Sequence, residues 1–290
     1  MLGGVCWRNN FIIRNERDTN MTLEQHRSNL LDRAVEDLSN DAAVLGIYLA
    51  GSLAKGDFDA YSDVDLHALV SRENLPEFIK EKYARPKNWG NVLYYESPRN
   101  RSAPNIVAHY DCFVKVDYWC ECLDDVKPSI WMKHCKVLHD KTGRLAEVIN
   151  ASKAVEYSAT ADDVLHWREK YLAYVHEAYR NAKRGEYYAA LEMIDTARWC
   201  IAYGWYAEKG IHINAPWGYS SKIEGERSQL DDSQKAMLAD WFCDRDAAKI
   251  LSTIAEMSPE FFRLNRKLSE TIGVDDEADM CRKALELIAE

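Results

Sequence analysis

The sequence contains no apolar run that approaches the roughly 18–20 residues needed to cross a lipid bilayer, and we see no secretory apolar segment in it. It also lacks a basic excess, because its formal net charge is −10 at pH 7. Sequence-independent binding of nucleic acid requires the opposite sign, which argues against that class of protein. We therefore expect a cytoplasmic protein that binds neither membrane nor nucleic acid.

A disulfide framework is not expected either, because the eight cysteines are scattered along the chain. Cys120, Cys122, His134, Cys135 and His139 invite an alternative interpretation as zinc ligands. Their spacing fits no common zinc pattern, so reduced, buried thiols are the favoured interpretation.

Two common phosphate-binding motifs are also missing. Gly51 and Gly56 have the separation of the two glycines of a P-loop, but Asp57 and Phe58 stand where that loop needs lysine and serine or threonine. The Gly-x-Gly-x-x-Gly pattern of dinucleotide-binding folds does not occur. A nucleotide, if bound, must be held in another way.

The length of 290 residues suits two domains, and the hydrophobic periodicity becomes continuously helical from Thr160. We expect a domain over residues 21–155 and a helical domain over 156–290. Residues 1–20 show no clear periodicity, so we expect Met21 to be the natural start and 1–20 to be an extension. The net charge is −3 over residues 1–150 and −7 over residues 151–290.

The first half of the chain mixes helical and strand patterns. The expected helices cover residues 23–39, behind a capping box at Thr22, and about 71–83. The expected strands cover 44–50, 64–70, 91–96, 105–118, which can split into a hairpin, and 137–139, with a glycine-containing loop joining the first two.

The second half predicts helices only. They run from about 160 to 184, 187–208, 232–242, 245–257, 259–271 with Pro259 in its first turn, and 276–289. Residues 211–227 are predicted to form a long loop that contains Trp217 and Tyr219. Most of the aromatic residues at helical spacing should form the core of this half.

Three aspartates carry the chemistry that the sequence suggests. Asp63 and Asp65 are two residues apart at the start of a strand and therefore point to the same face, and Asp117 lies on a later strand. Crowded carboxylates are unfavourable unless a cation compensates them, and Mg²⁺ prefers such oxygen ligands. Gly51 lets the backbone approach a phosphate, while the Ser52 hydroxyl can donate to its oxygens.

The pattern Gly51-Ser52, Gly56, Ser62-Asp63-Val-Asp65-Leu66 with a later Asp117 resembles the DNA polymerase β-like nucleotidyltransferase superfamily. With its helical second half, the whole chain looks like the aminoglycoside and lincosamide nucleotidyltransferases. The resemblance implies an α+β fold, in which a small mixed-sheet nucleotidyltransferase domain flanked by helices precedes a helical-bundle domain that binds the acceptor substrate.

By this resemblance, the nucleotide would be held by Gly51, Ser52, Lys55 and Ser62, and the Mg²⁺ by Asp63, Asp65 and Asp117. Lys55 can equally be an ordinary exposed lysine. Asp117 would be the third metal ligand or the base that deprotonates the acceptor, although pairing with Lys115 is its alternative. A further catalytic carboxylate is expected on the first helix of the second domain, where Glu169 is preferred to Glu177.

The expected activity is Mg²⁺-dependent transfer of AMP from ATP, or of another nucleotide, to a hydroxyl of a small, cationic molecule. An aminoglycoside antibiotic is the first choice, which would make the chain a resistance enzyme. Two alternatives are a non-catalytic, antitoxin-like relative and an adenylyltransferase that modifies proteins. The sequence leaves monomer and homodimer open.

Overall fold

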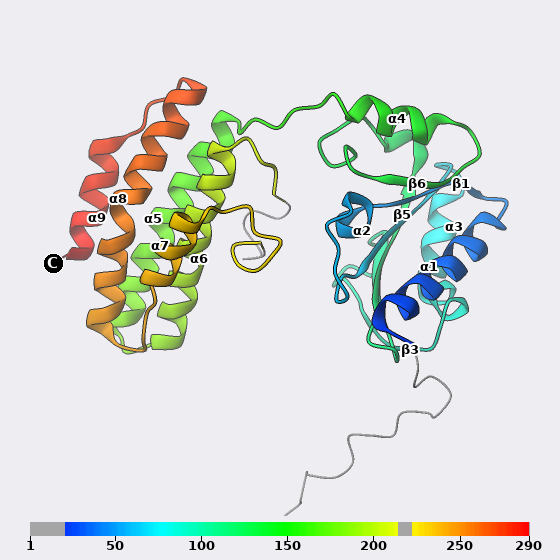
Figure 1. Cartoon of the computed structure of the whole chain (residues 1–290), viewed down its shortest axis with the longest axis horizontal. Helices are drawn as coiled ribbons and strands as arrows, with labels where there is room; N and C mark the ends of the chain where they lie inside the picture. The colour runs from blue at the N-terminus through cyan, green and yellow to red at the C-terminus, as the bar shows by residue number, and fades with distance from the viewer. Residues whose placement is uncertain (1–20, 214–221, 290) are drawn as a thin grey trace, which may run out of the picture. The chain divides into compact units, whose positions relative to one another are not determined.

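The computed structural model describes residues 21–213 and 222–289, and the chain divides into two compact units, Met1–Val155 and Glu156–Glu290 (Figure 1). The first unit is built on a sheet and the second is helical, so the predicted α+β class is confirmed. The expected extension over residues 1–20 lies outside the described residues. None of the described helices is long and apolar enough to span a membrane.

The first unit alternates strands and short helices. Its strands are β1 (Val44–Leu49), β2 (Val64–Val70), β3 (Val92–Glu96), β4 (Asn105–Tyr110), β5 (Lys115–Cys122) and β6 (Lys136–Asp140). Its α-helices are α1 (Leu23–Ser39), α2 (Gly51–Lys55), α3 (Leu75–Lys80) and α4 (Arg144–Ser152), and its 3-10 helices are η1 (Glu81–Tyr83), η2 (Arg85–Asn88) and η3 (Leu123–Asp125).

The strands form one mixed sheet in the order β3-β4-β5-β2-β1-β6. The neighbours β2 and β5 are parallel, whereas the other adjacent pairs are antiparallel. In the parallel pair, Asp65 stands opposite Asp117. The register of these two central strands therefore places two of the predicted site residues side by side.

The two faces of the sheet differ because side chains alternate along each strand. Val64, Leu66 and Ala68 of β2 are fully buried in a core that includes residues of α1 and α3. Figure 1 shows α1 and α3 on one side of the sheet and α2 on the other. The alternate residues Asp65 and His67 are only partly buried. The face away from α1 and α3 thus carries these polar side chains at the start of β2, and Leu69 near its other end packs in an apolar cluster with Leu145 of α4.

Local sequence explains most of these elements. Helix α1 begins where predicted, with a capping box in which Thr22 accepts a hydrogen bond from the Gln25 amide. The loop predicted between β1 and β2 is partly wrong, because α2 occupies its first five residues. Leu53, Ala54 and Lys55 favour helix, and Gly56 ends it with a left-handed conformation at φ 83°.

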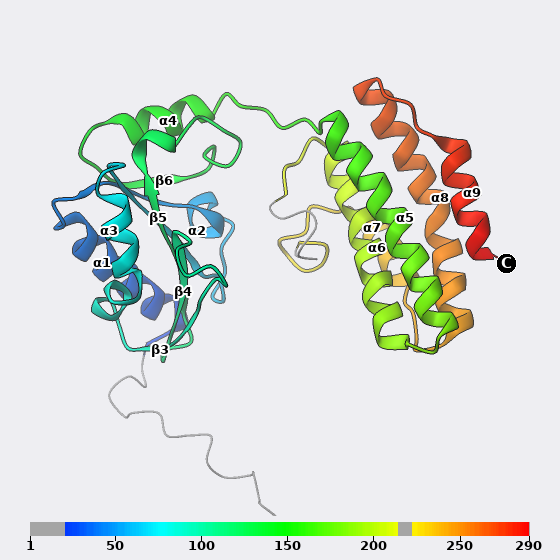
Figure 2. The same cartoon turned by 180° about the vertical axis from the view of Figure 1, so that it is seen from behind.

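The second unit consists of α5 (Ala161–Lys183), α6 (Tyr187–Glu208), α7 (Asp232–Asp240), α8 (Ala247–Ile272) and α9 (Ala278–Ala289). Helices α5, α6, α8 and α9 lie side by side in both views (Figures 1 and 2). Trp167, Tyr171 and Trp205 are fully buried in their core, which confirms the aromatic core predicted for this half. Trp217 and Tyr219 lie outside the described residues.

The break predicted before Pro259 is wrong, because α8 runs through it as one helix. Proline cannot donate the backbone hydrogen bond to Ala255, but both residues are exposed, where water can satisfy the freed carbonyl group. On the preceding residue, the Ser258 hydroxyl donates to the carbonyl of Ile254 at 2.7 Å. An apolar face on both sides of the proline keeps the helix continuous.

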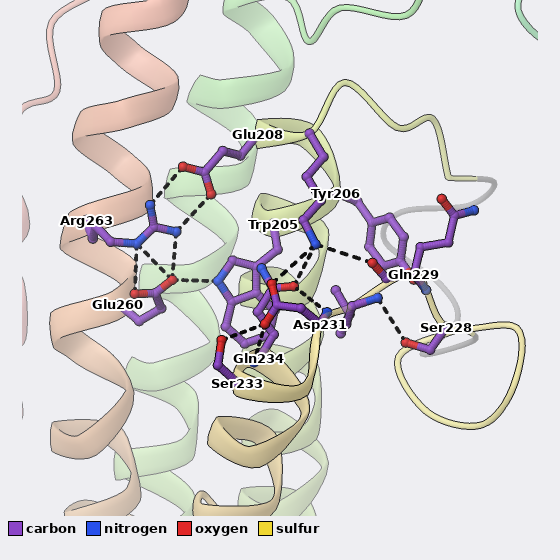
Figure 3. A network of polar contacts seen from close by, with 12 residues as sticks. Trp205, Tyr206, Glu208, Ser228, Gln229, Asp231, Ser233, Gln234, Glu260 and Arg263 are labelled. Atoms are coloured by element: carbon purple, nitrogen blue, oxygen red, sulfur yellow. Dashed lines mark hydrogen bonds and ion pairs between the residues drawn. The ribbon is translucent and has the colours of Figure 1, made fainter.

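A polar network ties α6 to α8 at the edge of this core (Figure 3). The Trp205 indole donates to Glu260 Oε1 at 2.5 Å, and Arg263 donates to both Glu260 and Glu208. Arg263 is 46% exposed, so its ion pairs add little stability, whereas the indole of the buried Trp205 needs its partner. The Trp205–Glu260 hydrogen bond is therefore the contact of this network that contributes most to joining the two helices.

Candidate active site

The three aspartates singled out from the sequence meet on the face of the sheet away from α1 and α3. Asp63 directly precedes β2, Asp65 lies within it, and Asp117 lies on β5. One carboxylate oxygen from each lies within 4.8 Å of the others. Across residues 21–213 and 222–289, no other cluster of histidine, cysteine or acidic residues is grouped closely enough to hold a metal ion. The zinc alternative involving Cys120 and Cys122 is therefore wrong.

The electrostatics of this cluster are unfavourable without a cation. Burial, together with the charges of Asp63 and Asp117, raises the pKa of Asp65 to about 6. Burial also raises the pKa of Asp117. The Oδ1 atom of Asp117 is buried and has no hydrogen-bond partner. Converging carboxylates with an unpartnered oxygen fit a hard divalent cation such as Mg²⁺.

Lys115 is a basic side chain in direct contact with the cluster. Its Nζ atom lies 2.8 Å from Asp63 Oδ2 and 3.7 Å from Asp117 Oδ2. It lies on β5 two residues before Asp117 and therefore on the same face. Burial lowers the pKa of Lys115, but its bond with Asp63 and the nearby carboxylates outweigh this effect and raise it. The alternative predicted for Asp117, pairing with Lys115, is thus present in the structure.

Gly51 brings the backbone against this cluster. The chain leaves β1 at Leu49, the Ala50 amide donates to the Asp65 carbonyl at 3.0 Å, and Gly51 turns into α2 with a left-handed φ of 62°. A β-carbon on Gly51 would overlap Asp65 Oδ2. Ser52 follows on the first turn of α2 and Lys55 lies exposed on its last turn.

The Ser62 side chain is buried and forms hydrogen bonds within its own loop. Its side chain is 8% exposed, its hydroxyl donates to Asp59 Oδ1 at 3.1 Å, and it accepts from the Asp59 amide at 3.0 Å. The hydroxyl thus shapes the loop that leads into Asp63, while its role in nucleotide binding stays a prediction.

Arg27 supports the same loop from α1 and was missed by the sequence interpretation. Its side chain is buried, and its Nη1 atom donates to the carbonyl of Asp59 at 2.7 Å and to that of Ser62 at 2.9 Å. Its guanidinium also lies over the Phe58 ring. The helical periodicity of residues 23–39 accommodates the aliphatic stem of Arg27 on the apolar side of the helix, but it does not indicate which groups the charged end contacts.

A second polar group lies next to the aspartates and was also missed. Glu121 Oε2 accepts a hydrogen bond from the Tyr48 hydroxyl at 2.8 Å and contacts His67 Nδ1 at 2.8 Å. The His67 ring stacks on the Tyr48 ring at 4.3 Å. His67 follows Asp65, and Glu121 follows Asp117, at even spacing on the same face, so strand alternation could have indicated this group.

An open pocket of about 370 Å³ borders the cluster on the side of β3 and β4. Asp63 and Lys115 form part of its lining, together with the exposed aromatic residues Tyr61, Tyr94 and Phe113. The ring of Tyr94 stacks on that of His109 at 4.2 Å. The acidic cluster is therefore accessible beside a surface that can contact a ring-shaped molecule.

Glu169 is the one predicted catalytic residue outside the first unit. It is exposed on α5, as expected for a solvated helix position, and its catalytic role stays a prediction.

Comparisons with known proteins agree with the geometry of the first unit. Residues 30–97, which include Gly51, Asp63 and Asp65, match the nucleotidyltransferase domain family. Asp117 lies beyond the matched residues. The comparison with curated proteins gave no significant match.

Two solved structures resemble the chain at low identity. An aminoglycoside 6-adenyltransferase from Bacillus subtilis is 11% identical with a TM-score of 0.41, over 93% of this chain and 99% of that one. A nucleotidyltransferase-like protein from Exiguobacterium sibiricum 255-15 is 13% identical with a TM-score of 0.41, over 84% of this chain and 77% of that one. The match over residues 30–97, together with the chemistry of Asp63 and Asp65 within it, identifies a nucleotidyltransferase domain in the first unit.

Proposed function

We propose that the chain transfers AMP from ATP to a hydroxyl group of a small molecule in a Mg²⁺-dependent reaction that releases pyrophosphate. The observation that carries this proposal is the convergence of Asp63, Asp65 and Asp117 within 4.8 Å. Such a cluster, placed next to a glycine that admits close approach of a ligand, is suited to holding a metal-bound triphosphate.

In this proposal Asp63, Asp65 and Asp117 hold the Mg²⁺. When bound, the ion supplies positive charge that offsets the negative charge developing on the transferred phosphoryl group. Gly51 and Ser52 bind the triphosphate through their amides and the Ser52 hydroxyl, and Lys55 adds a positive charge near the end of α2. The residues thus act by positioning the nucleotide and by balancing charge.

The acceptor hydroxyl must lose a proton when it attacks the α-phosphorus. Asp117 is the candidate base in the alternative version of the proposal, in which Asp63 and Asp65 alone hold the metal. Burial raises the pKa of Asp117 above the ordinary value of 3.8, which makes it a better proton acceptor than a fully solvated aspartate. The bond from the acceptor oxygen to phosphorus forms while the bond to the pyrophosphate oxygen breaks, and pyrophosphate carries away the electron pair.

We propose a cationic acceptor, with an aminoglycoside as first choice. The support is the charge of the second half of the chain, −7 over residues 151–290, which favours approach of a polycation. Glu169 on α5 is proposed to contribute a carboxylate toward this molecule. The second unit would accordingly be the acceptor-binding domain.

The test is to incubate the purified chain with ATP labelled at the α-phosphate, Mg²⁺ and a panel of aminoglycosides and lincosamides. We expect the label to enter a drug whose mass increases by one AMP, and we expect the same drug to lose potency against bacteria that express the chain. Asp63→Asn and Asp65→Asn should abolish transfer, whereas Asp32→Asn on the exposed surface of α1 should not. Near-normal pyrophosphate release by either active-site variant would refute the assignment.

The same experiment separates the alternatives. Label that enters protein instead of a drug would indicate an adenylyltransferase acting on side chains. The absence of turnover for all nucleoside triphosphates, combined with stable co-purification of a partner, would indicate a regulatory protein.

A further inference from the structure

Lys115 occupies the place where the acidic cluster needs a cation. Its Nζ atom lies 2.8 Å from Asp63 Oδ2 and 3.7 Å from Asp117 Oδ2, so it contacts two of the three carboxylates. Those carboxylates belong to the group whose oxygens lie within 4.8 Å of one another. An ammonium group and a divalent ion at this position therefore compete for the same negative charge.

The environment of Lys115 differs from that of a structural lysine in the same unit. Lys82 is 1% exposed, and its Nζ atom donates to the carbonyl groups of Arg101 and Ala103 at 2.8 and 2.5 Å. The side chain of Lys115 is 40% exposed, and its ion pairs join it to site carboxylates. It also lines the open pocket beside the cluster. Lys115 is therefore free to change partners without leaving a buried backbone group unpaired.

We propose that Lys115 is the counter-ion of the metal-free site and that it exchanges partners during catalysis. In the resting protein it pairs with Asp63 and Asp117. When a metal-bound nucleotide arrives, Lys115 releases the carboxylates and contacts a phosphate oxygen of the nucleotide. This inference rests on the proposed function, because it concerns the same metal and the same triphosphate.

The exchange has a consequence for the order of binding. Without nucleotide, a divalent ion must displace an ion pair and gains only carboxylate ligands. With nucleotide, the displaced ammonium finds a new anionic partner, so the cost of displacing it is offset. Free metal should bind weakly and the metal–nucleotide complex tightly, which makes Lys115 a positioning residue that couples the two ligands.

The test is a titration of the purified full chain with Mn²⁺, followed by electron paramagnetic resonance of the free ion. We expect Lys115→Gln to bind Mn²⁺ alone at least about tenfold more tightly than the natural protein, because the competing charge is gone. Lys115→Arg should stay near the natural value. Lys87→Gln, which removes an exposed lysine from η2, controls for the change in net charge.

A second titration uses a non-hydrolysable ATP analogue in the presence of saturating Mn²⁺. Here Lys115→Gln should bind the analogue more weakly, by about tenfold. A lysine that only stabilises the fold would not shift the two affinities in opposite directions. Thermal unfolding of each variant shows whether it is folded.

Equal or weaker binding of Mn²⁺ by Lys115→Gln would overturn the inference while leaving the proposed function intact. Unchanged affinity for the analogue would overturn the second half of the exchange. The proposed function fails in a different way: Asp65→Asn would then bind Mn²⁺ as well as the natural protein, which would remove the metal site together with its counter-ion.

Discussion

The backbone of Gly51 and the carboxylate of Asp65 are so close that a β-carbon on Gly51 would lie 1.7 Å from Asp65 Oδ2. Gly51 also has a left-handed φ of 62°. Two independent requirements thus exclude a side chain at this position, one from backbone conformation and one from the space that Asp65 takes. The first residue of the turn and the central aspartate of the cluster form a single geometric unit.

We expect Gly51→Ala to abolish nucleotide transfer, because Asp65 must move to make room for the methyl group. Gly56→Ala is the matched control, since Gly56 has a φ of 83° but nothing within 4 Å of a β-carbon. That variant should lose about 1 kcal/mol of stability from backbone strain alone and keep its site. Mn²⁺ affinity and pyrophosphate release distinguish the two. Similar losses of Mn²⁺ affinity in both variants would show that strain, rather than the overlap with Asp65, is responsible.

Asp65 should weaken the metal-free fold at neutral pH. Its pKa is raised to about 6 from an ordinary value of 3.8, mainly by burial, so the folded chain binds its proton more tightly than the unfolded chain does. Its contribution to stability is therefore favourable at low pH and is lost as the pH rises from about 4 through 6. In EDTA at pH 8, Asp65→Asn should be more stable than the natural protein by about 1–3 kcal/mol.

Urea unfolding at several pH values checks this expectation. The difference in free energy of unfolding between Asp65→Asn and the natural protein should shrink toward pH 4, where the natural carboxyl group becomes protonated. Saturating Mg²⁺ should reduce or reverse this difference at pH 8, because only the natural protein keeps all three carboxylates. Asp32→Asn on the exposed surface of α1 controls for net charge. A pH-independent difference would contradict the raised pKa.

The elements of the fold were largely predictable because their signals are local. The capping box at Thr22 and the alternation in β2 are each contained within a few residues, and both elements appear where predicted. Pro259 misled the interpretation because proline usually marks the start of a helix, while its tolerance inside α8 depends on exposure, a tertiary property.

The sequence indicated the three aspartates that converge, but not the residues that support them. The pattern of Asp63 and Asp65 is local, and the face of Asp117 follows from alternation along β5. The pairing of Asp65 with Asp117 is a parallel contact between residues 52 positions apart in the sequence, which no local pattern encodes. The contacts of Arg27 were even less predictable. Its partners are backbone carbonyl groups, which nearly every residue has, so no sequence pattern identifies them.

Arg27 should be needed both for stability and for the position of Asp63. Arg27→Met keeps the apolar stem but leaves the carbonyl groups of Asp59 and Ser62 without their buried donor, which should cost about 2–4 kcal/mol. Because Asp63 directly follows Ser62, we also expect weaker Mn²⁺ binding. Arg33→Met on the same helix is the control, since Arg33 is exposed and makes one long contact, at 3.4 Å, with the Trp89 carbonyl. Lower stability with unchanged Mn²⁺ affinity would limit Arg27 to a structural role.

Glu169 and Glu177 offer a paired test of the acceptor side, because they lie two turns apart on α5. Glu177 Oε1 forms an ion pair with Arg180 Nη1 at 2.5 Å, whereas Glu169 is exposed on the helix. If Glu169 binds the cationic acceptor, Glu169→Gln should raise the KM for that acceptor about tenfold while leaving the KM for ATP and the Mn²⁺ affinity unchanged. Glu177→Gln should leave all three near their natural values, because its charge is already paired at the surface. Steady-state kinetics with the drug found in the labelling experiment decides between the two residues. An equal rise in the KM of the acceptor for both substitutions would indicate a general influence of helix charge rather than a contact made by Glu169.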